Sequence, residues 1–285
     1  MKPRWFFFPT GLRRRRLRRG YLLLGLVALH AAAAAPRPAS VAVLVQGAEK
    51  PEVEEIVAAL EQPQKLQYGP FSFWVGRIGA HRVAVQLTGQ ALINCTTSTL
   101  IGIEEFQPKL IVNQGTSGAQ VPQLALHDII IGRRSLDYGI FTTPVRAKGQ
   151  GSAPLSWSPR PQALRDPATD RLVPFPEGFA GDAEALAVAQ RTRNGLGRVF
   201  PGVIGSAHEV NLELDRVQWS HRTFGLDVEE MESGHVAALA HAYGIRYIAF
   251  RVVSDAPYEG VPFHPEAARA TARFTIEFLR NLPAP

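Results

Sequence analysis

The sequence predicts an α/β fold in three layers, αβα, with a central mixed and twisted sheet. From residue 40 to residue 281, apolar runs typical of strands alternate with segments whose apolar residues recur at helical spacing. In "KLIVNQG" at 109–115, three consecutive apolar residues follow Lys109, which favours a strand covered on both faces. About 250 residues follow an N-terminal leader, enough for one well-buried domain, which we expect at 40–282.

The individual elements follow from their residue patterns. The run "SVAVLVQG" at 40–47 is apolar and ends in glycine, which favours a buried strand. The segment 51–62 has helical spacing, with Pro51 near its start, and the alternating run 71–89 turns near Gly79, which predicts a hairpin. The later elements are expected in this order: a helix at 90–106, strands at 109–115 and 127–134, a helix at 182–193, a strand at 197–207, a helix near 211–222, a strand and a helix within 226–243, a strand at 246–255 and a helix at 264–281.

The segment 139–178 differs from the rest of the chain. It is rich in proline and in small and polar residues, and it lacks the periodicity of a helix or a long strand. We interpret it as a loop-like excursion over the surface, either a lid or a partner contact.

The first 35 residues resemble an export signal. Lys2, Arg4 and six further arginines precede the short apolar run "YLLLGLVALHAAAAA", which ends in small residues before Pro36. This order is typical of a secretory signal peptide, and the apolar run is shorter than the roughly 20 residues of a membrane span. We therefore expect a periplasmic or secreted protein, with an uncleaved anchor as the alternative and a twin-arginine route left open.

Charge and cysteine content narrow the function classes. The chain has 31 Lys and Arg against 25 Asp and Glu, but the leader holds eight of the cations, which leaves 23 against 25. The remaining domain is mildly acidic, which argues against a nucleic-acid partner. The lone cysteine, Cys95, excludes an internal disulfide and lies in an apolar helical segment, where we expect it to pack as a small side chain.

Polar residues follow several of the predicted strands at their carboxyl ends, where ligands bind in folds of this class. Glu52 follows the first strand, and "EEMES" follows another. In "RYIAFRVVSD", Arg251 interrupts an apolar strand, and alternation places it on the same side as Asp255. A buried cation needs a partner, so an ion pair of Arg251 with Asp255 or with Glu52 is the structural alternative to a functional role.

A second polar strand end is "GTSG" at 115–118. A tight turn there would offer backbone N–H groups, together with the hydroxyls of Thr116 and Ser117, as a nest for ligand oxygens. We therefore count Thr116, Ser117 and Gly118 as candidate substrate-binding residues.

Together these segments resemble the nucleoside phosphorylase and nucleosidase superfamily, in particular the methylthioadenosine/S-adenosylhomocysteine nucleosidases. The resemblance runs from about residue 41 to residue 281. It is carried by "GAEKPEVEEI", "IVNQGTSGA", "HDIIIG", "VEEMES" and "FRVVSD", in the family's order. The resemblance implies the fold predicted above and the cleavage of an N-glycosidic bond.

The resemblance also implies the catalytic residues. Asp255 matches the aspartate that donates a proton to purine N7, and Ser254 would orient it. Glu52 matches the glutamate that positions and deprotonates the attacking water. Arg251 and the hydroxyl of Thr116 match the other groups around that water. A general acid of this kind has to be held protonated near neutral pH.

The ribose contacts are implied in the same way. Glu232 would accept hydrogen bonds from the 2′- and 3′-hydroxyls, and Met231 would pack against the sugar. Glu229 and Glu230, which precede this pair, are expected to remain ordinary acids of a first helical turn.

One segment departs from the family pattern. In relatives, the wall that stacks on the base tends to read Gly-Ser-Gly-Asp or to carry an aromatic residue, whereas this chain has "GSAHEVN" at 205–211, without an aromatic residue. His208, Glu209 and Val210 occupy that wall here, and we count Glu209 and Val210 as candidate base contacts. The identity of the base therefore stays open.

The sequence favours hydrolysis over phosphorolysis. Related phosphorylases carry an arginine on the strand that enters the Gly-Ser/Thr turn, whereas Asn113 and Gln114 stand here. An amide cannot neutralise phosphate, and Glu52 would repel it. We expect a hydrolase acting on a purine nucleoside or 5′-thionucleoside, with no cofactor and no metal. A non-catalytic nucleoside-binding or storage protein and a phosphate-dependent phosphorylase remain as alternatives, membrane contact is expected only through the leader, and a homodimer is left open.

Overall fold

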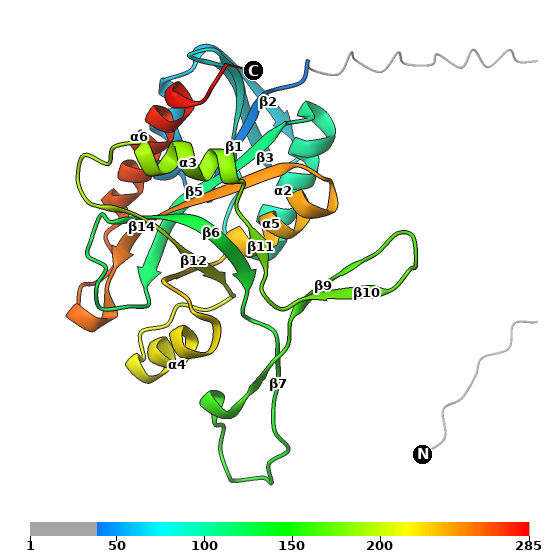
Figure 1. The fold of residues 1–285 in the computed structure, drawn as a ribbon, viewed down its shortest axis with the longest axis vertical. Coiled ribbons are helices and arrows are strands. Elements are labelled where there is room, and N and C mark those ends of the chain that lie inside the picture. Colours follow the sequence, from blue (N-terminus) through cyan, green and yellow to red (C-terminus); the bar gives the residue numbers. More distant parts are fainter. Residues whose placement is uncertain (1–38, 285) are drawn as a thin grey trace, which may run out of the picture. The chain divides into compact units, whose positions relative to one another are not determined.

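Residues 39–284 are described by a computed structural model, so the predicted signal peptide lies outside the described residues. They form a ten-stranded mixed sheet in the order β11-β6-β12-β13-β5-β1-β4-β3-β2, with β14 paired to both β5 and β6 (Figure 1). The long strands are β1 (Val43–Gly47), β2 (Glu61–Tyr68), β3 (Phe71–Ile78), β4 (His81–Leu87), β5 (Leu110–Ala119), β6 (Ile129–Asp137), β12 (Val199–Ser206) and β14 (Arg246–Asp255). Two short strands, β11 (Phe179–Ala180) and β13 (Val228–Glu230), complete the sheet.

Helices cover the sheet on both faces, which confirms the predicted three-layer αβα fold. The helices are α1 (Lys50–Ala58), α2 (Ala91–Phe106), α3 (Ala183–Arg191), α4 (Leu214–Phe224), α5 (Ser233–Ala242) and α6 (Ala268–Asn281). Apolar residues of α1, α3 and α6 pack with one face of the sheet, and those of α2 and α5 pack with the other. Cys95 of α2 is fully buried in this second layer, as expected from its apolar neighbours.

The predicted helix at 51–62 is too long. Helix α1 ends at Ala58, and Glu61–Tyr68 forms strand β2, which pairs antiparallel with β3 at the edge of the sheet. The sequence "EQPQKLQY" carries no strand signal because an edge strand is largely exposed, and an edge also tolerates Pro63.

Strand β5 also differs from expectation. It continues through Ala119 because β14 pairs with it in parallel over its whole length, from Arg246–Leu110 to Asp255–Gly118. The predicted "GTSG" turn is therefore strand. The register shifts between Val253 and Asp255, so strict alternation does not extend to the end of β14.

The excursion at 139–178 is not wholly a loop. It contains two small antiparallel ribbons outside the central sheet, which extend away from the layered core (Figure 1). One joins β7 (Phe141–Thr142) to β8 (Ser158–Pro159), and the other joins β9 (Gln162–Arg165) to β10 (Leu172–Phe175). These strands have two to four residues, too short for the sequence pattern to show them.

Candidate active site

The first turn of α1 places Glu52 at the carboxyl end of β1. Its Oε2 accepts hydrogen bonds from the backbone N–H of Ala48 at 2.6 Å and of Glu49 at 3.0 Å. Its Oε1 accepts from the backbone N–H of Thr116 at 2.9 Å, and the Thr116 hydroxyl lies 3.3 Å away. Burial raises the pKa of Glu52, although Arg251 and these N–H groups act in the opposite direction. The carboxylate is thus held in one orientation at the strand ends.

Gly115 allows Glu52 and Arg251 to approach each other. A Cβ atom at Gly115 would lie 2.5 Å from Glu52 Oε1 and 2.6 Å from Arg251 Nη1, closer than real Cβ contacts. A residue without a side chain is therefore required between the carboxylate and the guanidinium. The register agrees, because Arg251 of β14 is paired with Gly115 of β5.

The ion-pair partner of Arg251 is not one that the sequence indicates. Neither Asp255 nor Glu52 forms an ion pair with it among the described residues. Its Nη2 instead lies 2.5 Å from Glu230 Oε2, and its Nη1 lies 3.5 Å from Glu232 Oε2. These carboxylates stabilise the charge of an arginine that is only 2% exposed.

The expectation that Glu229 and Glu230 are ordinary first-turn acids is wrong. Both lie on strand β13 and are buried. Besides binding Arg251, Glu230 Oε2 accepts from the backbone N–H groups of Glu232 and Ser233, each at 2.9 Å. Strand β13 places these side chains inside the molecule, because it pairs with β12 on one side and β5 on the other.

Glu232 lies at the start of α5, directly after the partly buried Met231. Its Oε1 accepts a hydrogen bond of 2.8 Å from the backbone N–H of Ala91, at the start of α2. Burial, followed by repulsion from Glu230, raises the pKa of Glu232 to about 8, and Arg251 partly offsets this rise. A carboxylate with so few fixed partners has lone pairs left for the hydroxyls of a ligand.

Asp255 ends β14 beside Gly118, where a Cβ atom would lie 2.8 Å from its Oδ2. The hydroxyl oxygen of Ser254 lies 2.8 Å from Asp255 Oδ1 and 3.1 Å from the carbonyl oxygen of Ser117. Burial raises the pKa of Asp255, and the Ser254 hydroxyl lowers it. The hydroxyl of Ser117 itself donates to the carbonyl of Val252, so this side chain is committed to the sheet.

The expected base wall, 205–211, comprises the last two residues of β12 and the loop 207–211, which precedes α4. Glu209 Oε1 lies 2.9 Å from Arg216 Nη2, so this side chain is already paired. The Val210 side chain is 66% exposed. His208 Nε2 accepts from the backbone N–H of Leu92 at 3.2 Å. The contacts of Glu209 and Val210 with a base stay predictions.

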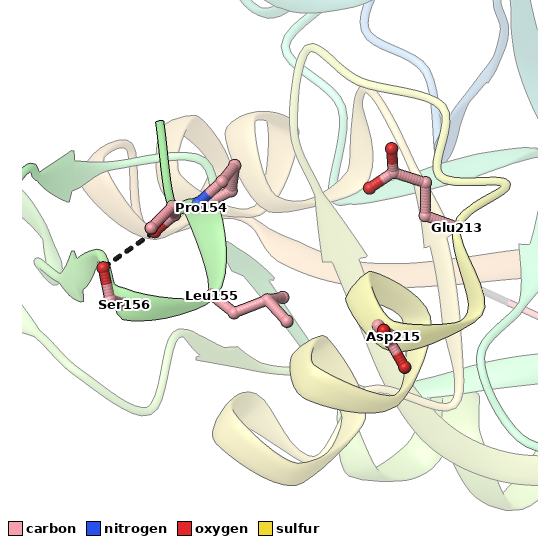
Figure 2. Close-up of a pocket in the computed structure, with 6 residues that line it drawn as sticks. Pro154, Leu155, Ser156, Glu213 and Asp215 are labelled. Atoms are coloured by element: carbon pink, nitrogen blue, oxygen red, sulfur yellow. Dashed lines mark hydrogen bonds between the residues drawn. The ribbon is translucent and has the colours of Figure 1, made fainter. Parts of the chain in front are cut away.

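The site side chains Glu52, Arg251, Glu232 and Asp255 are buried. Two surface cavities of the described residues lie away from them. One, of about 470 Å³, is bounded by a 3-10 turn (Pro154–Ser156) and by the start of α4 (Figure 2). The other, of about 390 Å³, lies between β10, β11 and the ends of α5 and β14. Neither is lined by Glu52, Arg251 or Asp255.

Residues 39–284 contain neither a candidate metal site nor a candidate membrane-spanning helix. Nowhere in this range do three or more His, Cys, Asp or Glu side chains gather as a metal ion requires. None of its helices combines the length and the apolar character needed to cross a membrane.

Known proteins share this arrangement of strands and motifs. Residues 42–280 match the family described as the Phosphorylase superfamily. The 5′-methylthioadenosine/S-adenosylhomocysteine nucleosidase of Shewanella halifaxensis is 23% identical over 244 residues, which are 83% of this chain and 97% of the relative. The enzyme of that name from Listeria monocytogenes is 26% identical over 248 residues, with the same coverage.

Solved structures give the same result for the fold. The nucleosidase of Neisseria meningitidis, in complex with methylthio-immucillin-A, has a TM-score of 0.67 at 23% identity and is covered over 99% of its length by 84% of this chain. The nucleosidase of Colwellia psychrerythraea, in complex with adenine, has a TM-score of 0.67 at 18% identity, with 86% of this chain and 97% of that chain covered. With a family match across most of its length and the corresponding fold, the protein belongs to the phosphorylase superfamily.

Proposed function

We propose that the protein hydrolyses the N-glycosidic bond of a purine nucleoside or 5′-thionucleoside, releasing the free base and the ribose moiety. The observation that carries the proposal is the placement of Glu52, which is held by the Thr116 N–H and lies beside Arg251 across Gly115. The curated relatives that the chain resembles are named as nucleosidases, and the alignments span nearly their whole length.

The described residues accept or donate each proton that the reaction moves: Glu52 accepts one and Asp255 donates one. A water at Glu52 attacks C1′ of the sugar and transfers a proton to the carboxylate, whose raised pKa favours this acceptance. The bond between C1′ and the base nitrogen breaks, and its electron pair goes to the base. Asp255 donates its proton to N7, so the base leaves neutral. Glu232 binds the ribose diol, through lone pairs that its contact with Ala91 leaves free.

Water is favoured over phosphate as the nucleophile by the charges around Arg251. Its guanidinium is paired with Glu230 and Glu232, and Glu52 lies next to it. One cation among three carboxyl groups offers little attraction to a doubly charged phosphate. The amide of Asn113 is also engaged, because its oxygen accepts from Arg251.

The test of the reaction is the identity of its products. The protein is incubated with a panel of purine nucleosides and 5′-thionucleosides, with and without phosphate, and base and sugar are separated. We expect free base and a reducing sugar at equal rates in both conditions. Base release that requires phosphate and yields a sugar 1-phosphate would establish a phosphorylase instead. Binding without any base release would support a non-catalytic binding protein.

We further propose that this activity is exported, to the periplasm or the medium. The support is the basic, then apolar, leader of residues 1–35. N-terminal sequencing of the protein from its native cells is expected to begin between residues 31 and 39. A chain that begins at Met1 and stays with the membrane fraction would indicate an anchor.

A further inference from the structure

The loop 207–211, which was expected to form the base wall, is tied to three other elements. His208 accepts from the backbone N–H of Leu92 at the start of α2. Glu209 is paired with Arg216 of α4. Asn211 is bonded through both its backbone and its side chain to Glu229 of β13. Since the loop has no regular secondary structure, these contacts determine where it lies.

Glu229 makes the shortest of these contacts. Its Oε1 accepts from the backbone N–H of Asn211 at 2.7 Å, and its Oε2 accepts from Asn211 Nδ2 at 2.6 Å. The hydroxyl of Tyr138, at the end of β6, donates to the same Oε2 at 2.6 Å. Glu229 is 5% exposed and Tyr138 is 1% exposed. A buried carboxylate with three short hydrogen bonds is an anchor for the groups that donate them.

Glu229 and the proposed general acid, Asp255, are both neighbours of Gly118. Glu229 is paired with Gly118 of β5, and Asp255 of β14 is paired with the same glycine. A Cβ atom at Gly118 would lie 2.8 Å from Asp255 Oδ2 and 3.6 Å from Glu229 Cγ. The loop anchor and the proposed proton donor to the base therefore pack against one residue.

We infer that Glu229 is a positioning residue, which holds loop 207–211 through Asn211 in the conformation that receives the base and thereby sets the affinity for the nucleoside. This inference rests on the proposed function. Glu229 takes no part in bond breaking, because the proposed reaction uses Glu52, Asp255 and Glu232. Its removal is therefore expected to change KM much more than kcat.

The charges around Glu229 make this anchor dependent on pH. The titratable groups around it are Tyr138, directly after β6, Glu209 from the loop and Asp255 across Gly118. Arg216 of α4 is paired with Glu209 and acts on Tyr138. Burial raises the pKa of Glu229 to about 7, while the bonds from Tyr138 and Asn211 lower it. Above that pH the carboxylate accepts all three bonds. Below it, the added proton occupies one acceptor position, so the loop loosens and KM rises as the pH falls.

The experiment compares Glu229→Gln with wild type across pH 5.5–8.5, using base release for kcat and KM and hydrogen exchange for the amides of residues 207–211. The glutamine keeps the size but presents an NH₂ group to the donors of Asn211. We expect KM to rise on the order of 10- to 100-fold with kcat within about threefold, and faster exchange in the loop. The dependence of KM on pH near 7 should disappear.

Two further variants make the test specific. Glu213→Gln is the matched control, because this exposed acid on the same connection has no side-chain hydrogen bond. It should behave as wild type. Tyr138→Phe removes one donor to the carboxylate, so the midpoint of the KM profile should shift to higher pH.

Each outcome decides the inference. An unchanged KM profile and unchanged loop exchange in Glu229→Gln overturn it, as does an equal effect of Glu213→Gln. If Glu229→Gln fails to fold, the direction of the Tyr138→Phe shift decides. If wild type releases base from no nucleoside, the proposed function fails, and loop exchange in the variants across pH still decides whether Glu229 positions the loop.

Discussion

Nη2 of Arg251 lies 2.5 Å from Oε2 of Glu230, and both side chains are almost fully buried, at 2% and 3% exposure. This pair joins β14 to β13 at the centre of the site, and Glu230 also accepts from the backbone at the start of α5. The Glu230 carboxylate therefore holds two groups in place: the Arg251 cation, which lies beside the proposed water, and the start of helix α5, which presents Glu232. The arginine is thereby neutralised without engaging Glu52 in an ion pair.

Glu230→Gln is expected to lower the free energy of unfolding by about 3–5 kcal/mol, because it leaves the Arg251 charge buried without its main partner. Chemical denaturation monitored by circular dichroism measures the change. Glu277→Gln is the control, since Glu277 forms an exposed ion pair with Arg280 and should cost less than about 1 kcal/mol. Equal costs for the two variants would show that the buried pair does not hold the site together.

The fold was predictable from sequence because its buried elements leave periodic patterns. Strands such as β1 and β14 are largely apolar, and α6 has a clear apolar stripe. Strand β2 was not predictable from the sequence, because this exposed, polar edge strand is held by backbone hydrogen bonds to β3 rather than by buried side chains. The ribbons within 139–178 were not predictable either, because their strands have only two to four residues.

The roles of neighbouring acids were less predictable. In "VEEMES" the motif points to Glu232, but nothing local distinguishes Glu230 from an exposed helical acid. Glu230 is the ion-pair partner of Arg251, which lies 21 residues later in the sequence. The two side chains become neighbours only when β13 and β14 are both part of the folded sheet. The one signal in the sequence is the arginine inside an apolar strand. A buried arginine requires a buried acidic partner, but the sequence does not show which acid that is.

Gly115→Ala is expected to abolish most activity and to cost about 1–3 kcal/mol of stability. The added methyl group would lie 2.5 Å from Glu52 Oε1 and 2.6 Å from Arg251 Nη1, so these two groups must move apart. The measurement is kcat together with a thermal melt. Gly195→Ala is the matched control, because its Cβ would meet no atom within 4 Å. A fully active Gly115→Ala variant would mean that the spacing of Glu52 and Arg251 does not matter.

Asp255→Asn is expected to lower kcat on the order of 10²- to 10⁴-fold, because an amide keeps the shape of the acid but cannot donate its proton. Wild-type kcat should fall as the pH rises through the pKa of Asp255, which burial raises above its usual range. The variant should lose this alkaline limb. Stopped assays of base release across pH measure both effects, and circular dichroism confirms the fold. A folded variant with wild-type kcat would remove Asp255 from the mechanism.

Glu232→Gln is expected to remove the preference for ribonucleosides over 2′-deoxynucleosides. A carboxylate accepts from both hydroxyls of the diol, and loss of a hydrogen bond to a charged group costs on the order of 10- to 100-fold in kcat/KM. Because burial and Glu230 raise the pKa of Glu232 to about 8, the wild-type preference should grow as the pH rises through that value, where the carboxylate form takes over.

The matched control for this prediction is Glu229→Gln, which changes a second buried acid three residues before Glu232. It should raise KM for ribo- and deoxynucleosides alike and leave their ratio unchanged, because its bonds go to Asn211 and Tyr138. The measurement is kcat/KM for paired substrates at pH 6.5 and 8.5 in the three proteins. A wild type that cleaves both sugars equally at either pH would show that Glu232 does not bind the diol.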